Sequence, residues 1–330
     1  MRTNATLLAD QVKASYSPTV IVEYLDGSWT ALANIVEVTH KQEAYGAQAT
    51  IRINNYDGTY DSTDLRNKQV RIKWGANGTT ETYPYLWGYA QEKISNPDRS
   101  EYIVYAEGAW NKLRRWTSDA DYDFNQTTPA LQNKNVKEII DYIGQKAGLA
   151  AIGANIGTLD TVTETWEPEV TLYKGENGFN AVMGVLGITR CVLVPRTDTV
   201  HLKYPASGDS VDYTYVSDSQ HFFRAAAIRE TYFRPMKVKI TTDDPYSGEF
   251  AHASWDSSHG VLELENTWNV IGSDADCVTM ATGMVEKFER EAEIGMLSGP
   301  INFLQEIHDK ITVTDNCGGA SATGKRVGGI

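Results

Sequence analysis

Short segments in which apolar and polar residues alternate dominate roughly the first 115 residues of the chain. They cover residues 19–25, 35–39, 49–53, 70–74 and 102–106. Successive side chains of a strand point to opposite faces, so this alternation is typical of strands with one face in a core. Turn formers separate the segments: Asp26-Gly27 suits a tight hairpin, and Pro97 favours a type I turn within residues 95–100. Many short strands joined by such turns predict a β-sandwich or a β-barrel.

The pattern becomes helical in the middle of the chain. Apolar residues spaced three and four positions apart define one helix face: Val136, Ile139, Ile140, Ile143 and Ala147. Asn133 or Asn135 can cap the start of this helix. A shorter helix is expected from about Asn177, followed by a hairpin within residues 191–204. These elements predict a small α/β unit.

Strand-like segments return after residue 206, at residues 237–240, 260–265 and 310–314. A helix interrupts them, with Ser273 as its N-cap and Asp276 three positions later. Residues 68–73 and 309–314 share one polar–apolar alternation, a faint internal echo. The predicted fold class is α+β and β-dominated. Two tube-like β-barrel domains, residues 1–118 and 206–330, flank a small α/β domain of residues 119–205, and the second barrel contains an inserted helix near residues 273–294.

Composition excludes several functional classes. The chain carries 30 Lys and Arg against 43 Asp and Glu, a net charge of −13, whereas a protein that grips nucleic acid through phosphates needs a basic surface. Its three cysteines, Cys191, Cys277 and Cys317, lie far apart without zinc-site spacing, so neither a metal nor a disulfide framework is indicated. No apolar run approaches the roughly 18 residues that span a bilayer, and no signal peptide is evident. We expect no cofactor, no membrane anchoring, and folding in a reducing cytosol.

The stretch INNYDGTYDS, residues 53–62, has the oxygen-rich composition of a ligand site. As a calcium-binding EF-hand loop, with Gly58 at the sixth position, it would need Ile53 as its first ligand, and a hydrocarbon side chain cannot serve. As a glycosidase acid pair, Asp57 with Asp61 or Asp64 would need a pocket that a polar loop does not offer. Turn chemistry explains the stretch better. We predict a turn between two strands, with Asn54, Asp57 and Gly58 setting its geometry.

The remaining candidate sites are weak. Residues 319–325 match a phosphate-binding loop, but Arg326 stands where a magnesium-binding Ser or Thr is needed. The six histidines show no metal-site spacing, although His252 and His259 bracket a Trp-Asp pair in a loop. No nucleophile motif appears, so the chain is not expected to be an enzyme.

Several segments, taken in order, resemble the phage tail hub (baseplate hub) family, which is related to the base of secretion-system spike proteins. They are residues 49–60, 65–75, 86–94, 135–149, 175–204 and 309–315. Gly88 and Tyr89 open a strand within the third of them. One departure from the family pattern is His308-Asp309, where the family usually has Gly-Asp before its last barrel strand.

This resemblance implies a structural, non-enzymatic role in the virion, at the tail tip or baseplate, after assembly in the host bacterial cytoplasm. Such hubs carry two tube-like barrels per subunit and form homotrimers. The resulting pseudo-hexameric ring joins the tail tube to the tip or spike and lines the channel for genome ejection. The implied partners are the tail tube protein, the distal tail protein, tip, spike or fibre proteins, and a tape-measure protein in the lumen. DNA would be in transient passage only.

An alternative interpretation is a tail-associated β-protein that binds or cleaves carbohydrate. The chain has 18 Tyr and 8 Trp, and Tyr83, Tyr85 and Trp87 could stack on sugar rings. Barrel cores and subunit interfaces use aromatic residues equally, so composition leaves both functions open.

Overall fold

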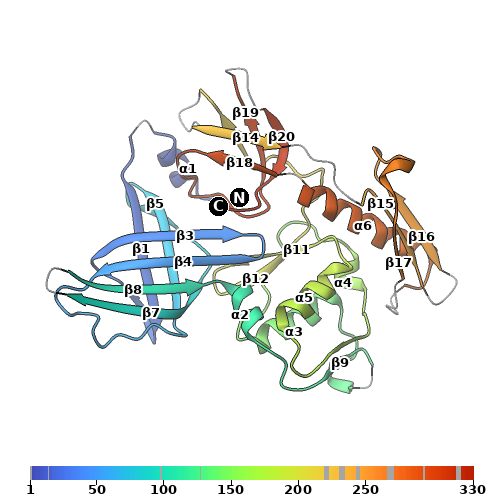
Figure 1. The fold of residues 1–330 in the computed structure, drawn as a ribbon, viewed down its shortest axis with the longest axis horizontal. Helices are drawn as coiled ribbons and strands as arrows, with labels where there is room; N and C mark the ends of the chain where they lie inside the picture. Colours follow the sequence, from blue (N-terminus) through green and yellow to red (C-terminus); the bar gives the residue numbers. More distant parts are fainter. Residues whose placement is uncertain are drawn as a thin grey trace.

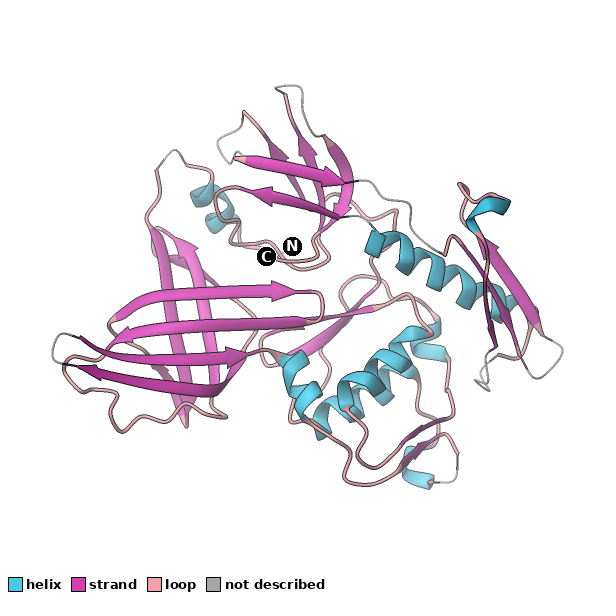
Figure 2. Cartoon of the chain, in the orientation of Figure 1, coloured by secondary structure: helices cyan, strands magenta, loops and turns pink. Residues whose placement is uncertain are grey.

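The computed structural model describes residues 2–330 except residues 14, 97–98, 127, 219–222, 230–234, 243–245, 266–270, 293 and 317–320. Within that part of the chain the fold is α+β and β-dominated, as predicted, with several sheets and few helices (Figure 2). The turn predicted around Pro97 and the thiol of Cys317 fall outside the described residues. Among the described helices, none combines the length and apolarity needed to cross a membrane.

One eight-stranded sheet contains the strands of the N-terminal region. Their bounds are β1 (Pro18–Asp26), β2 (Ser28–Ala31), β3 (Ile35–Glu43), β4 (Gly46–Asn54), β5 (Gln69–Ala76), β6 (Thr79–Thr82), β7 (Leu86–Asn96) and β8 (Arg99–Glu107). The order is β2-β1-β5-β7-β8-β4-β3, with β6 paired to β5. The β5–β7 ladder is only two residue pairs long, so β1 and β5 cross β3, β4, β7 and β8 at a steep angle (Figure 1). The inward residues of both halves form one core, which includes Val22, Ile51 and Ile72.

The predicted first barrel is not closed by a strand ladder in the described chain. Edge strands β2 and β3 do not pair with each other. Residues 32–34 bridge the gap instead, through single hydrogen bonds from Leu32 N to Val22 O (2.8 Å) and from Asn54 N to Asn34 O (2.9 Å). Asn34 has a positive φ of 57°, which turns the chain away from an extended path here. The result is a curled open sheet.

The middle of the chain packs helices against small β elements. Their bounds are α2 (Ala109–Arg115), β9 (Tyr122–Phe124), η1 (Pro129–Leu131), α3 (Val136–Lys146), α4 (Val162–Thr165), β10 (Val170–Leu172), α5 (Gly178–Gly187), β11 (Val192–Arg196) and β12 (Thr199–Lys203). Of the two cap candidates Asn133 and Asn135, the structure selects Asn135, which accepts from Glu138 N in a capping box. The second helix begins next to Asn177 as predicted, and Asn177 is its N-cap. The predicted hairpin is β11–β12.

The predicted second barrel appears as three separate small sheets. Their elements are β13 (Tyr213–Val216), β14 (Ala225–Arg229), β15 (Lys237–Thr241), β16 (Ser247–Ala251), η2 (Ser257–His259), β17 (Leu262–Glu265), α6 (Asp274–Ala292), β18 (Ile294–Ser298), β19 (Lys310–Thr314) and β20 (Ala322–Arg326). The sheets are β13-β19-β20, β14-β18 and β16-β15-β17. Helix α6 is the predicted inserted helix, and Asp276 N donates to Ser273 Oγ at its start (3.2 Å). Because α6 packs on β15 and β16, it separates that sheet from the other two, which prevents one continuous ladder (Figure 1).

Candidate functional site

The residues predicted to shape the turn after β4 lie in a loop, residues 55–68, that leads to β5. Asn54 Oδ1 accepts from Tyr56 N (3.1 Å), and Asp57 Oδ1 accepts from Thr59 N (3.1 Å). Gly58 has a φ of +71°, a conformation that glycine adopts without a steric cost. The backbone hydrogen bond to Asp57 is the main reason that its pKa lies below the usual value.

Asn55, which the sequence interpretation overlooked, organises this loop. Its side chain is buried, its Oδ1 accepts from Tyr60 N (2.8 Å), and its Nδ2 donates to Asp61 Oδ1 (2.8 Å). Its own N–H donates to Ser100 O (2.9 Å), which ties the loop to β8. A signal was present in the sequence: the inward face of β4 includes Ile51 and Ile53, and Asn55 continues that alternation.

Tyr56 and Tyr60 occupy opposite environments in this loop. Tyr60 is buried, stacks on Tyr102 at 5.7 Å between ring centroids, and accepts a hydrogen bond from Ala33 N (2.7 Å). Tyr56 is 79% exposed, the highest value among the large hydrophobic side chains of the described residues. The loop therefore presents one aromatic ring to solvent from a backbone fixed by internal hydrogen bonds.

Replacing Asn55 by alanine is expected to lower the free energy of unfolding by about 2 kcal/mol, because the buried N–H of Tyr60 would lose its acceptor. Asn54→Ala is the matched control, since Asn54 is exposed and bonds one exposed amide, and we expect about 0.5 kcal/mol or less. Urea unfolding of both variants measures the difference. Equal losses for the two would contradict the role given to Asn55.

Gly88 and Tyr89 lie in β7, away from the turn itself. Gly88 N donates to Lys68 O (3.0 Å), and a Cβ at this position would lie 2.1 Å from Leu65 O, so only glycine permits this close approach of two backbones. The β7–β8 register shifts between Gly88 and Ala90, and the Arg115 guanidinium lies 4.7 Å from the ring centre of Tyr89. Gly88 therefore holds the end of the loop where it meets the sheet, whereas Tyr89 contacts Arg115 and Tyr105 outside the loop.

The histidines and cysteines considered as site residues from the sequence do not form a common site among the described residues. Among the described residues no three His, Cys, Asp or Glu side chains gather in a geometry that could hold a metal. His252 lies 3.5 Å from Glu289, while His259 lies 3.0 Å from Asp256. Cys191 and Cys277 are free thiols and buried.

The aromatic residues considered for sugar stacking are mostly inside the protein. Tyr83 and Trp87 are buried, and the Lys112 ammonium lies over the Trp87 ring at 4.8 Å. Tyr85 makes an edge contact with Trp29. Two of the three rings therefore offer no open face to a sugar.

Residues 302–309 form the place where the chain's separate regions meet, and we call them the junction segment. Phe303 and Leu304 are buried together with Leu7 of α1 (Ala5–Gln11) and Ala76 of β5. Tyr83 Oη from the first sheet donates to Phe303 O (3.1 Å).

Hydrogen bonds to two other elements complete the junction. Tyr215 Oη of β13 donates to Gln305 Oε1 (2.9 Å), and Lys203 Nζ of β12 donates to His308 O (3.1 Å). Elements from the beginning, middle and end of the chain are thereby fixed to one another.

Two buried carboxylates give the junction segment its charge. Glu306 accepts from Arg196 Nε (2.8 Å) and lies 3.7 Å from Arg2 Nε. Burial opposes its ionisation, but the two arginines outweigh burial and hold the pKa of Glu306 below its usual value. Asp309 accepts from Gln305 Nε2 (2.9 Å) and from Glu306 N (2.7 Å), and burial raises its pKa.

His308 occupies a conformation that side chains rarely adopt, with a φ of +66°. Glycine would adopt this φ without strain. Burial, together with nearby Lys203, Arg290 and Arg326, lowers the pKa of His308 to about 3, so its ring is neutral at pH 7. Its Nε2 atom is buried and has no hydrogen-bond partner among the described residues.

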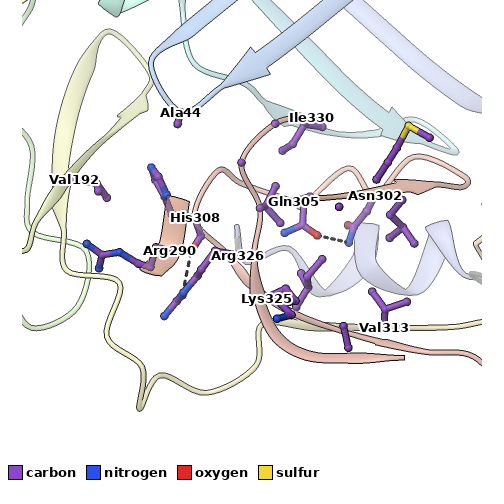
Figure 3. A pocket seen from close by; sticks show the side chains of 18 of the residues that line it. Ala44, Val192, Arg290, Asn302, Gln305, His308, Val313, Lys325, Arg326 and Ile330 are labelled. Atoms are coloured by element: carbon purple, nitrogen blue, oxygen red, sulfur yellow. Dashed lines mark hydrogen bonds between the residues drawn. The ribbon is translucent and has the colours of Figure 1, made fainter. Parts of the chain in front are cut away.

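A cavity of about 900 Å³ lies beside the junction segment. Its walls come from the β3–β4 turn, α5, β11, the end of α6, β14, β18 and the C-terminal residues. Arg290, His308 and Arg326 lie close together at one end, and Asn302 and Gln305 lie at the other (Figure 3). Exposed Met296, Ile301 and Ile330 add apolar surface to its lining.

No protein-family model matches the sequence, and a comparison with curated proteins finds no match. Solved structures do match it along nearly the whole chain. A tail protein from Neisseria meningitidis MC58 has a TM-score of 0.64 at 10% identity, covering 93% of this chain and 89% of that chain.

Two further structures agree with this result. The 43 kDa tail protein of prophage MuSo2 from Shewanella oneidensis has a TM-score of 0.57 at 11% identity, covering 94% of this chain and 92% of that one. Prophage tail protein gp18 from Listeria monocytogenes EGD-e has a TM-score of 0.57 at 9% identity, covering 92% and 87%. The chain therefore has the fold of phage tail proteins, and the resemblance to the tail hub family is confirmed at the level of the fold.

Proposed function

We propose that this chain is a structural subunit of a phage or phage-like tail tip, and that three copies form a pseudo-hexameric ring joining the tail tube to the tip or spike. The observation that carries the proposal is the end-to-end fold match with the N. meningitidis tail protein, which covers 93% of this chain. In this proposal residues 1–118 and 206–330 supply the tube-forming units, and residues 119–205 connect them.

The open sheets support assembly through their edges. An unpaired strand edge presents N–H and C=O groups that favour pairing with another chain. Edge strand β2 of the first sheet lies at such an end, and in the described part of the chain the β14–β18 sheet has two strands. Two-stranded sheets are marginally stable alone. Tube-like barrels would then be completed when neighbouring copies place these edges beside each other.

The junction segment supports a mechanical role. A ring subunit must hold its β units in one fixed relation, so that the same contacts repeat around the axis. Contacts from Tyr83, Lys203 and Tyr215 to the junction segment restrain the first sheet, the β11–β12 hairpin and the β13 sheet together. The described site offers this rigid connection.

The proposed partners are the tail tube and distal tail proteins on one side and tip, spike or fibre proteins on the other, with a tape-measure protein in the lumen. The net charge of −13 is compatible with DNA passing through a channel, because an acidic lining repels phosphates and avoids adhesive contacts. The chain would reside in the virion tail after assembly in the host cytoplasm.

The proposal predicts that the purified chain forms a trimer. Light scattering coupled to size exclusion should give three chain masses, and electron micrographs should show rings with a central opening. A chain that stays monomeric at all concentrations and is absent from tail particles would overturn the proposal.

A further inference from the structure

The cavity beside the junction segment differs in charge from the chain as a whole. Its lining contains four cationic residues: Lys287, Arg290, Lys325 and Arg326. The described residues of the lining include no Asp or Glu, although acidic residues outnumber basic ones 43 to 30 in the chain. A basic cavity with apolar walls is complementary to a ligand that is both apolar and anionic.

The guanidinium of Arg290 marks the place in the cavity where a negative charge on the ligand would be stabilised. This guanidinium donates to two carbonyls, Pro205 O (3.0 Å) and Arg190 O (3.4 Å), and among the described residues it forms no ion pair; the carboxylate of Glu286 pairs with Arg190 instead, at 3.6 Å. The neighbouring Arg326, in contrast, pairs with Asp209 at 2.6 Å. Burial lowers the pKa of Arg290, and the nearby Glu286 carboxylate, which is not in ion-pair contact, offsets this only in part.

His308 is a second residue of this cavity, and within the described part of the chain one of its ring nitrogens has an unsatisfied hydrogen bond. Its buried Nε2 has no partner among the described residues, and a neutral imidazole has one nitrogen able to accept a hydrogen bond. A hydroxyl donor close to Arg290 would supply this bond. A ligand that supplies a carboxylate to Arg290 and a hydroxyl group to His308, with apolar groups against the walls, would therefore complement the cavity.

The loop after β4 carries these groups side by side. Tyr56 offers a 79% exposed ring with its hydroxyl, and the next residue, Asp57, is an exposed carboxylate. The hydrogen bonds of Asn54 and Asn55 fix the backbone around them, so little conformational entropy is lost when they bind. We call Tyr56 and Asp57 the knob.

The knob cannot enter the cavity of its own chain. Ala44 and Tyr45 of the cavity precede β4, and the knob follows its other end (Figure 1). Strand β4 has 9 residues, which at about 3.3 Å each separate its ends by roughly 30 Å. A contact between different patches on neighbouring copies is the type that closes into a ring.

We propose that the knob of one copy inserts into the cavity of the next, with the Asp57 carboxylate on Arg290 and the Tyr56 hydroxyl on His308. The inference rests on the proposed trimeric function and specifies the contact that holds the ring together. Three identical knob-in-cavity contacts would close one trimer.

The first test compares Tyr56→Ala with Tyr173→Ala in the full chain. Tyr173 is also strongly exposed, at 65%, but lies outside the knob and the cavity lining. Sedimentation over a concentration series should show trimer dissociation for Tyr56→Ala at about 10- to 100-fold higher concentration than for wild type. Tyr173→Ala should match wild type. Circular dichroism spectra of both variants establish that each is folded.

A charge exchange tests the Asp57–Arg290 pair. Asp57→Arg and Arg290→Glu should each weaken the trimer about tenfold or more, and the double variant should regain most of the loss. A crosslink provides a further test. In a chain with Cys317→Ser, cysteines are placed on the knob (Tyr56→Cys) and in the cavity (Met296→Cys), since Met296 lines the cavity and is 67% exposed. Oxidation of this variant should yield covalent trimers. Tyr173→Cys with Met296→Cys should not crosslink.

The outcomes separate the two proposals. If Tyr56→Ala forms trimers as stable as those of the wild type, and the double charge variant shows no recovery, the knob contact is overturned while the ring proposal stands. A wild-type chain that never forms trimers would overturn the ring, and the knob contact with it.

Discussion

Glu306→Gln is expected to lower the free energy of unfolding by about 3 kcal/mol, the largest effect that we predict for a single side chain. The substitution preserves the shape of the side chain and removes its charge. Arg196 and the buried Arg2 would then lose the carboxylate that both face. Removing one member of a buried ion cluster is costly because the remaining charges stay out of water without a partner.

Glu37→Gln is the matched control for this experiment. Glu37 pairs with Arg52 at 3.1 Å, but its side chain is 54% exposed, and exposed ion pairs contribute about 0–1 kcal/mol. Urea unfolding at pH 7.5 should therefore separate the two variants clearly. Similar losses for both would show that the junction segment does not depend on its buried charge.

Acidification from pH 6.5 to 4.5 is expected to remove about 4 kcal/mol of stability. Two buried histidines cause this loss: the pKa of His40 is lowered to about 4, mainly by burial, and that of His308 to about 3. The unfolded chain binds a proton at each histidine below about pH 6.5, whereas the folded chain does not. Each histidine thus contributes about 1.4 kcal/mol per pH unit in this window. The sum is comparable to the net stability of many proteins, about 5–15 kcal/mol.

Between pH 6.5 and 4.5, carboxylates change the free energy of unfolding less than the two histidines do. Glu306, with its lowered pKa, loses its contribution only below about pH 4.5, where the unfolded carboxyl is protonated. Asp309 has a raised pKa and acts with the opposite sign, because acidification favours its folded, protonated form. Asp309 therefore offsets part of the loss due to the histidines.

Urea unfolding at half-unit steps of pH measures this effect. His40→Gln and His308→Asn should each reduce the slope by about 1.4 kcal/mol per pH unit between pH 6 and 5. Asparagine is chosen at position 308 because it tolerates the positive φ of 66°. Unchanged slopes in both variants would contradict the assignment to these two side chains.

Local elements of the fold could be predicted from the order of residues alone. Alternation identified β1, β4 and β5, and helical spacing with Asn135 at the cap identified α3. These features depend on neighbours within a few positions, and such interactions are encoded in short segments. The turn residue Gly58 was identified for the same reason.

Barrel closure could not be predicted in this way. The sequence indicated enough strands for two barrels, but edges β2 and β3 remain apart, and α6 separates the late strands into distinct sheets. Which edges pair depends on long-range packing, because one amphipathic strand can pair with many others equally well.

The junction segment shows this limit most clearly. Its sequence, residues 302–309, contains Glu306 and Asp309, which on composition alone are surface residues. They are buried because Arg2 and Arg196, located 304 and 110 positions away from Glu306, converge on the same point in space. Short-range patterns thus specify strands, turns and caps, whereas the burial of charge arises from distant segments meeting, because Coulomb energy depends on separation in space and not along the chain.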